Sequence, residues 1–206
     1  MKLSIYIGKS VKNIRLFFHH FFHVFLTKMK LFSNEVQLGK NMGTTGSPFI
    51  SVTMGGHMKI GDNFKMNNDI TGNPLSFHPC SFWVGKKACL LIGNNVGISQ
   101  STIITHSLIT IGNNVKIGAD CLIVDTDFHS LNPQKRMDTF EDRKAVNVKP
   151  VTICDNVFIG ARTIVLKGVE IGENSIVGAG SVVTKNIPPN EIWAGNPAKF
   201  IKKINV

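Results

Sequence analysis

The sequence predicts an all-β fold in which the chain winds into a parallel solenoid, preceded by a short helix and interrupted by one loop. Three observations predict it: a strict six-residue spacing of aliphatic residues, glycines placed beside them, and a single polar break in the rhythm. A helix would show a 3.6-residue spacing and a simple strand would alternate, so a period of six fits neither. The clearest run of inward positions is Ile153, Ile159, Val165, Ile171, Val177 and Val183.

The same spacing recurs earlier, which indicates that the solenoid covers most of the chain. If each hexad forms one flat face, three faces complete a coil of about eighteen residues, and Ile153 stacks on Ile171. Glycine beside the aliphatic residue, as at Gly160, permits a tight corner. No coil buries its apolar face alone, so stacked neighbours stabilise the fold. Further inward positions are expected at Ile60, Met66, Val84, Ile92, Ile98, Ile104, Ile111, Ile117 and Ile123.

A polar segment breaks the repeat in the middle of the chain. After Ile123 the next inward place is residue 129, and the repeat resumes in register only at Ile153. We therefore expect a loop at residues 130–150, and long loops in a compact solenoid are uncommon and usually functional. Two prolines, Pro188 and Pro189, end the coils. The expected organisation is a helical segment at 1–33, a β-helix at 34–190 and a C-terminal tail at 191–206.

The N-terminal segment differs from the rest in charge. Residues 1–32 carry six Lys and Arg and no Asp or Glu. The apolar run at 16–26 contains three histidines and is shorter than the roughly 20 residues of a membrane span. It lacks a small-residue cleavage site, so we expect no signal peptide. We expect a helix that caps the open end of the coils or packs on a neighbouring subunit; peripheral contact with an anionic membrane is the alternative.

Composition narrows the function classes. The four cysteines form no C-x-x-C pair, which favours reduced thiols in a cytoplasmic protein over a disulfide framework. The protein would lie at the inner face of the membrane if its N-terminal helix binds there. The net charge is +10, yet no nucleic-acid-binding motif accompanies it, so we expect no nucleic-acid partner.

Several motifs carry a family resemblance. The most specific are VTICDNVFIGA at 151–161, GVEIG at 168–172, IVGAGSVVTK at 176–185 and AGNPAK at 194–199. Over roughly residues 84–203 the chain resembles the hexapeptide-repeat acyltransferases, in particular the branch of maltose and galactoside acetyltransferases and polysaccharide O-acetyltransferases. The resemblance implies a left-handed coil, although parallel crossovers are otherwise nearly always right-handed. It also implies a homotrimer with active sites between subunits.

The resemblance identifies His129, directly before the loop, as the catalytic histidine. An alcohol is a poor nucleophile until its proton is removed, and histidine titrates near neutral pH, so a general base of this type suits the reaction. Asp127 or Asp125 could hold the imidazole in its productive tautomer, or could simply cap a turn. By resemblance, the backbone N–H of Ala161 stabilises the oxyanion of the tetrahedral intermediate.

The implied co-substrate is acetyl-CoA, and no metal is expected. Its pantetheine arm would lie along the coils like an added strand and exchange main-chain hydrogen bonds. Lysines of the last coil and the tail would meet the nucleotide phosphates as point charges, although each could be an ordinary surface lysine. By resemblance, the residues expected to contact CoA are Gly160, Ala161, Ala179, Thr184, Lys185, Asn196, Lys199 and Lys202.

The acceptor site is predicted from fewer signals. Candidates precede His129 in the coils or lie beside the expected cleft, and each could instead be an ordinary corner residue. Phe158 stands where the family often has tryptophan, at a place where the acceptor is expected to pack. The acceptor-binding candidates are Asp125, Phe158, Ser99, Ser101 and His106.

Two rival functions share this architecture. A γ-type carbonic anhydrase needs three histidines, two of them five residues apart, to bind zinc. His106 and His129 are present, but the required third position holds Gln134, so a metal site is not expected. The other rival is a non-catalytic trimeric scaffold or carbohydrate-binding module, which a direct CoA-binding test would separate from an enzyme.

The preferred interpretation is an O-acetyltransferase that moves an acetyl group from acetyl-CoA to a carbohydrate hydroxyl. A surface or capsular polysaccharide precursor is the leading acceptor class, by analogy with the resembled branch. The sequence leaves open which sugar and hydroxyl react, how long the acyl chain is, and whether an amine replaces the hydroxyl.

Overall fold

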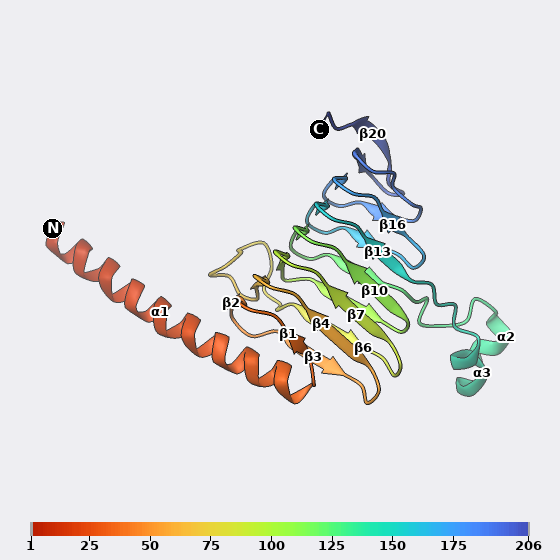
Figure 1. Ribbon diagram of the computed structural model, residues 1–206, viewed down its shortest axis with the longest axis horizontal. Helices are drawn as coiled ribbons and strands as arrows, with labels where there is room; N and C mark the ends of the chain where they lie inside the picture. The colour runs from red at the N-terminus through yellow and green to blue at the C-terminus, as the bar shows by residue number, and fades with distance from the viewer. Residues whose placement is uncertain (1, 206) are drawn as a thin grey trace.

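Three stacks of short strands form the sides of a coil that rises along the molecule (Figure 1). The computed structural model describes residues 2–205, with side chains from residue 13 onward. Sheet A consists of β1 (Gln37–Leu38), β4 (His57–Ile60), β7 (Cys89–Ile92), β10 (Leu108–Ile111), β13 (Val151–Ile153) and β16 (Glu170–Ile171). Sheet B consists of β2 (Gly43–Thr45), β5 (Lys65–Asn67), β8 (Gly97–Ser99), β11 (Lys116–Ile117), β14 (Phe158–Ile159), β17 (Ile176–Val177), β19 (Glu191–Ala194) and β20 (Lys199–Lys203). Sheet C consists of β3 (Phe49–Val52), β6 (Ser81–Val84), β9 (Thr102–Thr105), β12 (Leu122–Val124), β15 (Ile164–Val165) and β18 (Val182–Val183).

The predicted eighteen-residue stacking holds in the C-terminal coils. Ile153 pairs with Ile171, and the same offset joins β14 to β17 and β15 to β18, all in parallel. Each of the six aliphatic residues of this run is fully buried. The core is therefore a column of aliphatic side chains inside the coil.

Among the inward residues predicted within the coils, Ile104 is wrong. Ile104 is half-buried, whereas Ile103 is fully buried and pairs with Ile123. The corner before β9 is one residue shorter than a regular hexad, and Gln100 turns it in the left-handed region with φ 41°. This tight corner moves the inward position one residue earlier.

An asparagine ladder lines the corner between sheets A and B. Seven asparagines, one from each coil, occupy the left-handed region with φ between 57° and 62°, which asparagine tolerates better than most side chains. Their amides donate to one another from coil to coil over 2.8–3.1 Å. The ladder consists of Asn41, Asn63, Asn95, Asn114, Asn156, Asn174 and Asn190.

The predicted loop leaves the coil after β12 and returns at β13. It contains two short helices, α2 (Pro133–Arg136) and α3 (Thr139–Lys144), which project beyond the strand ends (Figure 1). Its two ends pair with each other: Thr126 bridges Val148, and the Lys149 N–H donates to the Asp125 carbonyl over 2.9 Å. This closed neck explains why Ile111 still pairs with Ile153 across the insertion.

The two ends of the chain attach differently. Helix α1 (Lys2–Ser33) packs its last turns on the first coil and extends away from it (Figure 1). The C-terminal tail does not form a separate unit, because β19 pairs in parallel with β17 and adds one more strand to sheet B after the prolines. Strand β20 then pairs antiparallel with β19. All four cysteines are unpaired thiols.

Candidate active site

The corner between sheets C and A carries the candidate catalytic histidine. Strand β12 ends at Val124, and the buried carboxylate of Asp125 follows. That carboxylate accepts hydrogen bonds from the Thr105 hydroxyl (2.7 Å), the His106 N–H (2.7 Å) and the Ser107 N–H (2.8 Å). Because Asp125 is fully buried and paired within the chain, the predictions that it orients His129 or binds acceptor are wrong. It instead fixes the preceding coil to the base of the loop.

Asp127 is also paired away from the histidine. Its carboxylate lies 2.6 Å from the Lys167 ammonium, and each side chain is only about one-fifth exposed. The prediction that the Asp127 side chain orients the imidazole is therefore wrong. The pair joins the start of the loop to the next coil.

A strained turn presents His129 to solvent. Phe128 adopts φ 62°, a conformation that costs a bulky residue of order 1–3 kcal/mol. The Phe128 N–H donates to the Thr126 hydroxyl (3.0 Å), and the His129 N–H donates to the Asp127 carbonyl (2.7 Å). The turn takes the chain off the coil, so residue 129 is not an inward position. Its side chain is 71% exposed.

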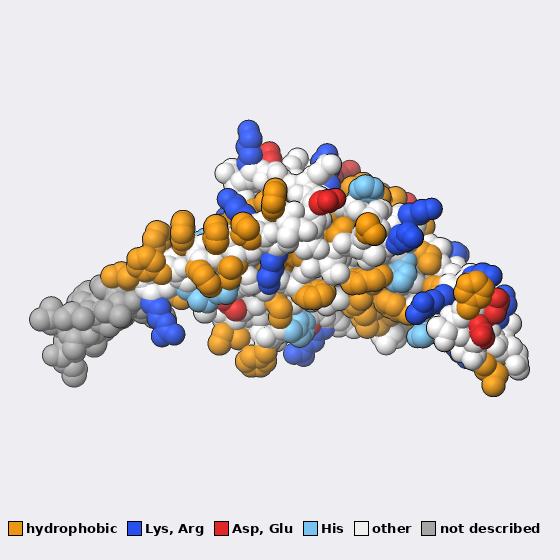
Figure 2. All heavy atoms as spheres, turned by 90° about the horizontal axis from the view of Figure 1, so that it is seen from below, with side chains coloured by type: hydrophobic (Ala, Val, Ile, Leu, Met, Phe, Trp, Pro, Cys, Tyr) orange, Lys and Arg blue, Asp and Glu red, His pale blue; other side chains and the backbone are white. Residues whose placement is uncertain are grey.

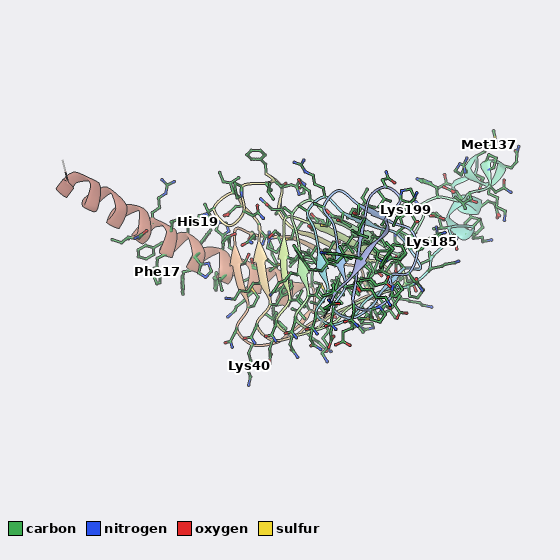
Figure 3. All side chains as sticks on the ribbon, turned by 90° about the horizontal axis from the view of Figure 1, so that it is seen from above. Phe17, His19, Lys40, Met137, Lys185 and Lys199 are labelled. Atoms are coloured by element: carbon green, nitrogen blue, oxygen red, sulfur yellow. The ribbon has the colours of Figure 1, made fainter. Side chains whose placement is uncertain are left out.

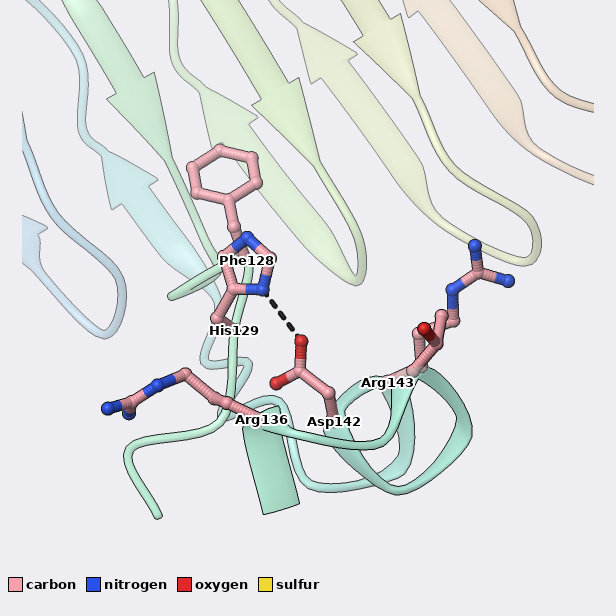
Figure 4. A pocket seen from close by; sticks show the side chains of 6 residues that line it. Phe128, His129, Arg136, Asp142 and Arg143 are labelled. Atoms are coloured by element: carbon pink, nitrogen blue, oxygen red, sulfur yellow. Dashed lines mark hydrogen bonds and ion pairs between the residues drawn. The ribbon is translucent and has the colours of Figure 1, made fainter. Parts of the chain in front are cut away.

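The orienting carboxylate is Asp142, which the sequence did not reveal. His129 Nδ1 lies 2.7 Å from Asp142 Oδ2 (Figure 4). The Ser130 N–H donates to the other carboxylate oxygen over 2.7 Å. A carboxylate only accepts hydrogen bonds, so Nδ1 carries the proton and Nε2 is left as the base. The hydrogen bonds from His129 and Ser130 hold the pKa of the Asp142 carboxyl below its usual value.

Helix caps place Asp142 opposite the histidine. The Asp138 carboxylate accepts from the N–H groups of Phe140 and Glu141 and starts α3, as a capping aspartate commonly does. The Asn132 side chain caps α2 in the same way. The only sequence signal for Asp142 was its place in a loop expected to be functional, because no repeat extends through this segment.

A pocket of about 560 Å³ opens beside this pair. It is lined by Phe128, His129, Arg136, Thr139, Asp142 and Arg143 (Figure 4). Arg136 donates to the Ser130 carbonyl over 2.7 Å, so it braces the residue after the histidine. With two arginines and one paired carboxylate, the pocket wall is cationic.

An aromatic group extends from this pocket along the same corner. The His106 ring lies 4.8 Å from Trp83 at 37°, and it meets Phe128 edge-on at 6.0 Å. His106 therefore lies beside Phe128, the residue before His129, and its contact with acceptor stays a prediction. Trp83 was not predicted, since nothing in its hexad distinguishes it from a packed strand residue.

The other acceptor candidates lie elsewhere. Ser101 is fully buried, and its hydroxyl lies 2.7 Å from the carbonyl oxygens of Ser99 and Gly118. Its predicted contact with acceptor is therefore wrong, because the hydroxyl is used within the corner. Ser99 and Phe158 line a separate hollow of about 220 Å³ on sheet B. The single chain does not bring these two to His129.

Three CoA candidates line another pocket at the last coil. Thr184, Lys185 and Lys199 border a space of about 320 Å³, and the two lysines lie close together in Figure 3. Lys202 is exposed on β20, and Asn196 lies in the turn before it. Thr184, Lys185 and Lys199 thus lie together, and the contact of these residues with CoA stays a prediction.

Ala161 and Ala179 stack at the corner between sheets B and C. A Cβ at Gly160 would come within 2.5 Å of the Ala179 nitrogen, so glycine is required for the coils to approach. Among the described residues, neither alanine N–H donates a hydrogen bond. Both are left available to a ligand.

The predicted residues therefore fall at opposite edges of sheet C. His129 and His106 lie at the corner with sheet A, whereas Ala161 and Ala179 lie at the corner with sheet B. The strands between them have two to four residues, and a strand rises about 3.3 Å per residue. One chain alone thus keeps the histidine and the alanine amides about 10 Å apart or more. No group of three or more His, Cys, Asp or Glu in the described residues is placed to hold a metal.

Comparison with known proteins supports this architecture. A model described as bacterial transferase hexapeptide (six repeats) matches residues 150–185. The galactoside O-acetyltransferase of Escherichia coli K12 is 36% identical over 133 residues, which is 60% of this chain and 61% of that protein. A relative from Schizosaccharomyces pombe is 46% identical over 103 residues. The chain spans 47% and 61% of the lengths of these curated relatives.

Solved structures match over more of the chain. A galactoside acetyltransferase in complex with coenzyme A has a TM-score of 0.55 and 29% identity, and the match covers 86% of this chain and 70% of that one. A variant of AntD, an N-acyltransferase from Bacillus cereus in complex with dTDP-4-amino-4,6-dideoxyglucose and coenzyme A, has a TM-score of 0.67 and 20% identity, covering 87% and 89%. The predicted left-handed parallel β-helix is confirmed. The chain thus carries the hexapeptide repeat of bacterial transferases at residues 150–185 and is similar to galactoside O-acetyltransferase in sequence and in fold.

Proposed function

We propose that this protein transfers an acetyl group from acetyl-CoA to a hydroxyl of a carbohydrate, with His129 as the general base. The observation that carries the proposal is the His129–Asp142 pair, 2.7 Å apart at the mouth of a pocket. A histidine held by a carboxylate at one nitrogen and exposed at the other is suited to remove a proton from an alcohol.

The proposed reaction is a direct transfer. His129 Nε2 takes the proton of the acceptor hydroxyl while the oxygen attacks the thioester carbonyl carbon. The negative charge that develops on the carbonyl oxygen accepts a hydrogen bond from the Ala161 N–H. The C–S bond then breaks, the sulfur takes the proton from the imidazolium, and the products are the acetyl ester and free CoA. Asp142 stabilises the transient imidazolium and keeps its ring in position.

A complete site requires a second copy of the chain in this proposal. The His129 corner and the Ala161 corner lie at opposite edges of sheet C. A closed ring of subunits brings one surface patch against a different patch of the neighbour. A homotrimer in which the His129 corner of one subunit meets the Ala161 corner of the next would join base and oxyanion donor.

The cationic end of the coils suits CoA. Lys185 and Lys199 border the same pocket as Thr184, and ammonium groups favour phosphates as point charges. The pantetheine arm would run along the free N–H groups of Ala179 and Ala161 toward the reacting thioester. The coenzyme A complex of the related galactoside acetyltransferase supports this ligand.

A carbohydrate acceptor fits the surroundings of the histidine. Trp83, His106 and Phe128 form an aromatic group, and aromatic faces pack against the C–H groups of sugar rings. Arg136 and Arg143 on the pocket wall suit an acceptor with a carboxylate or phosphate. The 36% identity to a galactoside O-acetyltransferase favours a hydroxyl acceptor, and an anionic polysaccharide precursor is the proposed class.

Thermal stabilisation by acetyl-CoA tests the ligand. A ligand that binds only the folded state raises the melting temperature, by an amount set by its concentration relative to Kd. We expect a saturable rise for the wild type and a weaker one for Lys199→Ala. Lys40→Ala, a lysine at the other end of the coils (Figure 3), is the matched control and should respond like the wild type. No rise at millimolar acetyl-CoA would exclude the transferase and leave the scaffold or binding module.

A further inference from the structure

From residue 13 onward, where its side chains are described, helix α1 contacts the coils through one face. Thr27 and Leu31 are fully buried against the first coil, and the Lys30 ammonium donates to the Pro48 carbonyl over 2.9 Å. The Val52 N–H donates to the Asn34 side chain over 2.9 Å and fixes the end of the helix. The C-terminal half of α1 therefore caps the open end of the coils, as the sequence favoured.

The opposite face of α1 is apolar and uncovered. Its residues are spaced by three or four, so they share one side of the helix. They form a row of hydrophobic side chains along the helix in Figure 2, and each is more than half exposed. The uncovered face consists of Ile14, Phe18, Phe21, Phe25, Met29 and Phe32, with Phe17 and Phe22 beside it.

Cations border this face and no acid accompanies them. At 100° per residue, Arg15 falls on one side of the apolar row and Lys28 on the other. Both are exposed. The first Asp or Glu of the sequence is Glu35, after the helix ends. The exposed face is thus aromatic at its centre and positive along its edges.

We propose that α1 lies on the surface of an anionic lipid bilayer, with its phenylalanines in the headgroup boundary. Apolar aromatic residues flanked by Lys and Arg are the composition of helices that lie in the membrane interface, and each cation near an anionic surface adds attraction. No helix in the described part of the chain is long and apolar enough to cross a bilayer. A second copy fits less well, because pairing two such faces brings cations against cations.

This proposal does not depend on the enzymatic activity. It concerns a face that points away from the coils, whereas the candidate site lies at the corner of sheets C and A. The β-helix would be attached to the membrane through its first coil. The same attachment would hold for a scaffold or for a transferase.

Vesicle flotation with the full chain tests the proposal. We expect the wild type to float with phosphatidylcholine vesicles containing about one third phosphatidylglycerol and to bind pure phosphatidylcholine at least about tenfold more weakly, since the cations add to the attraction. Added salt should weaken binding to the anionic vesicles. Phe21→Ser/Phe25→Ser and Arg15→Gln/Lys28→Gln should each reduce binding about tenfold or more.

A matched control distinguishes vesicle binding by this face of α1 from non-specific hydrophobic binding. Met54→Ser/Phe77→Ser removes two apolar side chains that are 91% and 88% exposed outside α1, and it should bind vesicles like the wild type. Circular dichroism checks that every variant is folded. Failure of the wild type to float with anionic vesicles would overturn the proposal. Unchanged flotation of Phe21→Ser/Phe25→Ser would also overturn it. A sedimentation mass of this variant that differs from that of the wild type would overturn it too, because it would identify a second copy as the occupant.

Discussion

Two corners of the coil differ in regularity: one repeats the same residue in every coil, and the other changes from coil to coil. At the corner between sheets A and B, every coil repeats an asparagine near φ 60°, with amides in contact over 2.8–3.1 Å. At the corner between sheets C and A, each coil differs: one turn is fixed by the Asp125 carboxylate, the next carries Phe128 and His129, and a third carries Lys167.

The difference separates stability from chemistry. The ladder gives each asparagine between its two ends two partners of its own kind, so the corner is satisfied without any ligand. The irregular corner instead holds a phenylalanine at φ 62° and leaves His129 exposed, and strain of this kind persists where the surroundings over-determine it. Repetition stabilises the coil, and its interruption places the candidate catalytic groups.

The largest expected effect comes from removing the base. His129→Ala should lower kcat for acetyl transfer about 10²–10⁴-fold, the usual contribution of general base catalysis. Because the side chain is mostly exposed, the melting temperature should stay within about a degree or two of the wild type. Steady-state kinetics and thermal denaturation measure both, with the exposed His57→Ala as control. Equal losses in the two histidine variants would contradict the assignment.

Loss of the orienting carboxylate should have a smaller effect. Asp142→Asn leaves a hydrogen-bonding side chain but no charge to stabilise the imidazolium, so we expect kcat to fall about 10–100-fold with KM little changed. A variant that raised KM alone would indicate a role in acceptor binding instead.

The same substitution predicts a pH dependence of stability. The folded state holds the pKa of Asp142 below its usual value. Its contribution to stability is therefore present at neutral pH and is lost as the pH falls through that lowered pKa. The stability difference between wild type and Asp142→Asn should be constant above about pH 5 and shrink in acid. Urea denaturation at several pH values measures it, and a difference that grew in acid would contradict the assignment.

Substitutions in the asparagine ladder should lower stability and leave kcat unchanged. Asn114→Ala removes contacts to Asn95 and Asn156 and puts alanine at φ 59°, so we expect a loss of about 2 kcal/mol in unfolding free energy. Asn114→Gly loses the contacts but tolerates the backbone and should cost less. Thermal or urea denaturation checks the order. The kcat of the folded protein should not change, and a catalytic defect would break the division between the corners.

The smallest expected change in stability is at Phe128. Phe128→Gly relieves the left-handed strain but loosens the unfolded chain and loses the contact with His106, so we expect a net change within about 1 kcal/mol. The kcat should still fall, because the turn that presents His129 becomes flexible. Denaturation midpoints and kcat measured on one preparation test this. A large destabilisation would show that Phe128 contributes to stability, as the asparagine ladder does.

The sequence predicted the structural features that follow from its six-residue repeat. The hexads predicted the inward residues of the last coils and the position of the loop, because both follow from spacing. The six-residue spacing favours Ile104 over Ile103, because the short corner at Gln100 leaves no visible break in the sequence. The sequence points to Asp127 and Asp125 because they lie next to His129 in the chain, whereas the helix caps of the loop bring Asp142 to the imidazole.

The most direct test is release of the CoA thiol from acetyl-CoA in the presence of carbohydrate acceptors, comparing wild type with His129→Ala. Both proteins should first be shown to gain the same thermal stability from acetyl-CoA, so that binding is held constant. We predict acceptor-dependent thiol release by the wild type and release reduced at least about 10²-fold in the variant. Equal acceptor-dependent release by both proteins would contradict the role of His129 as general base.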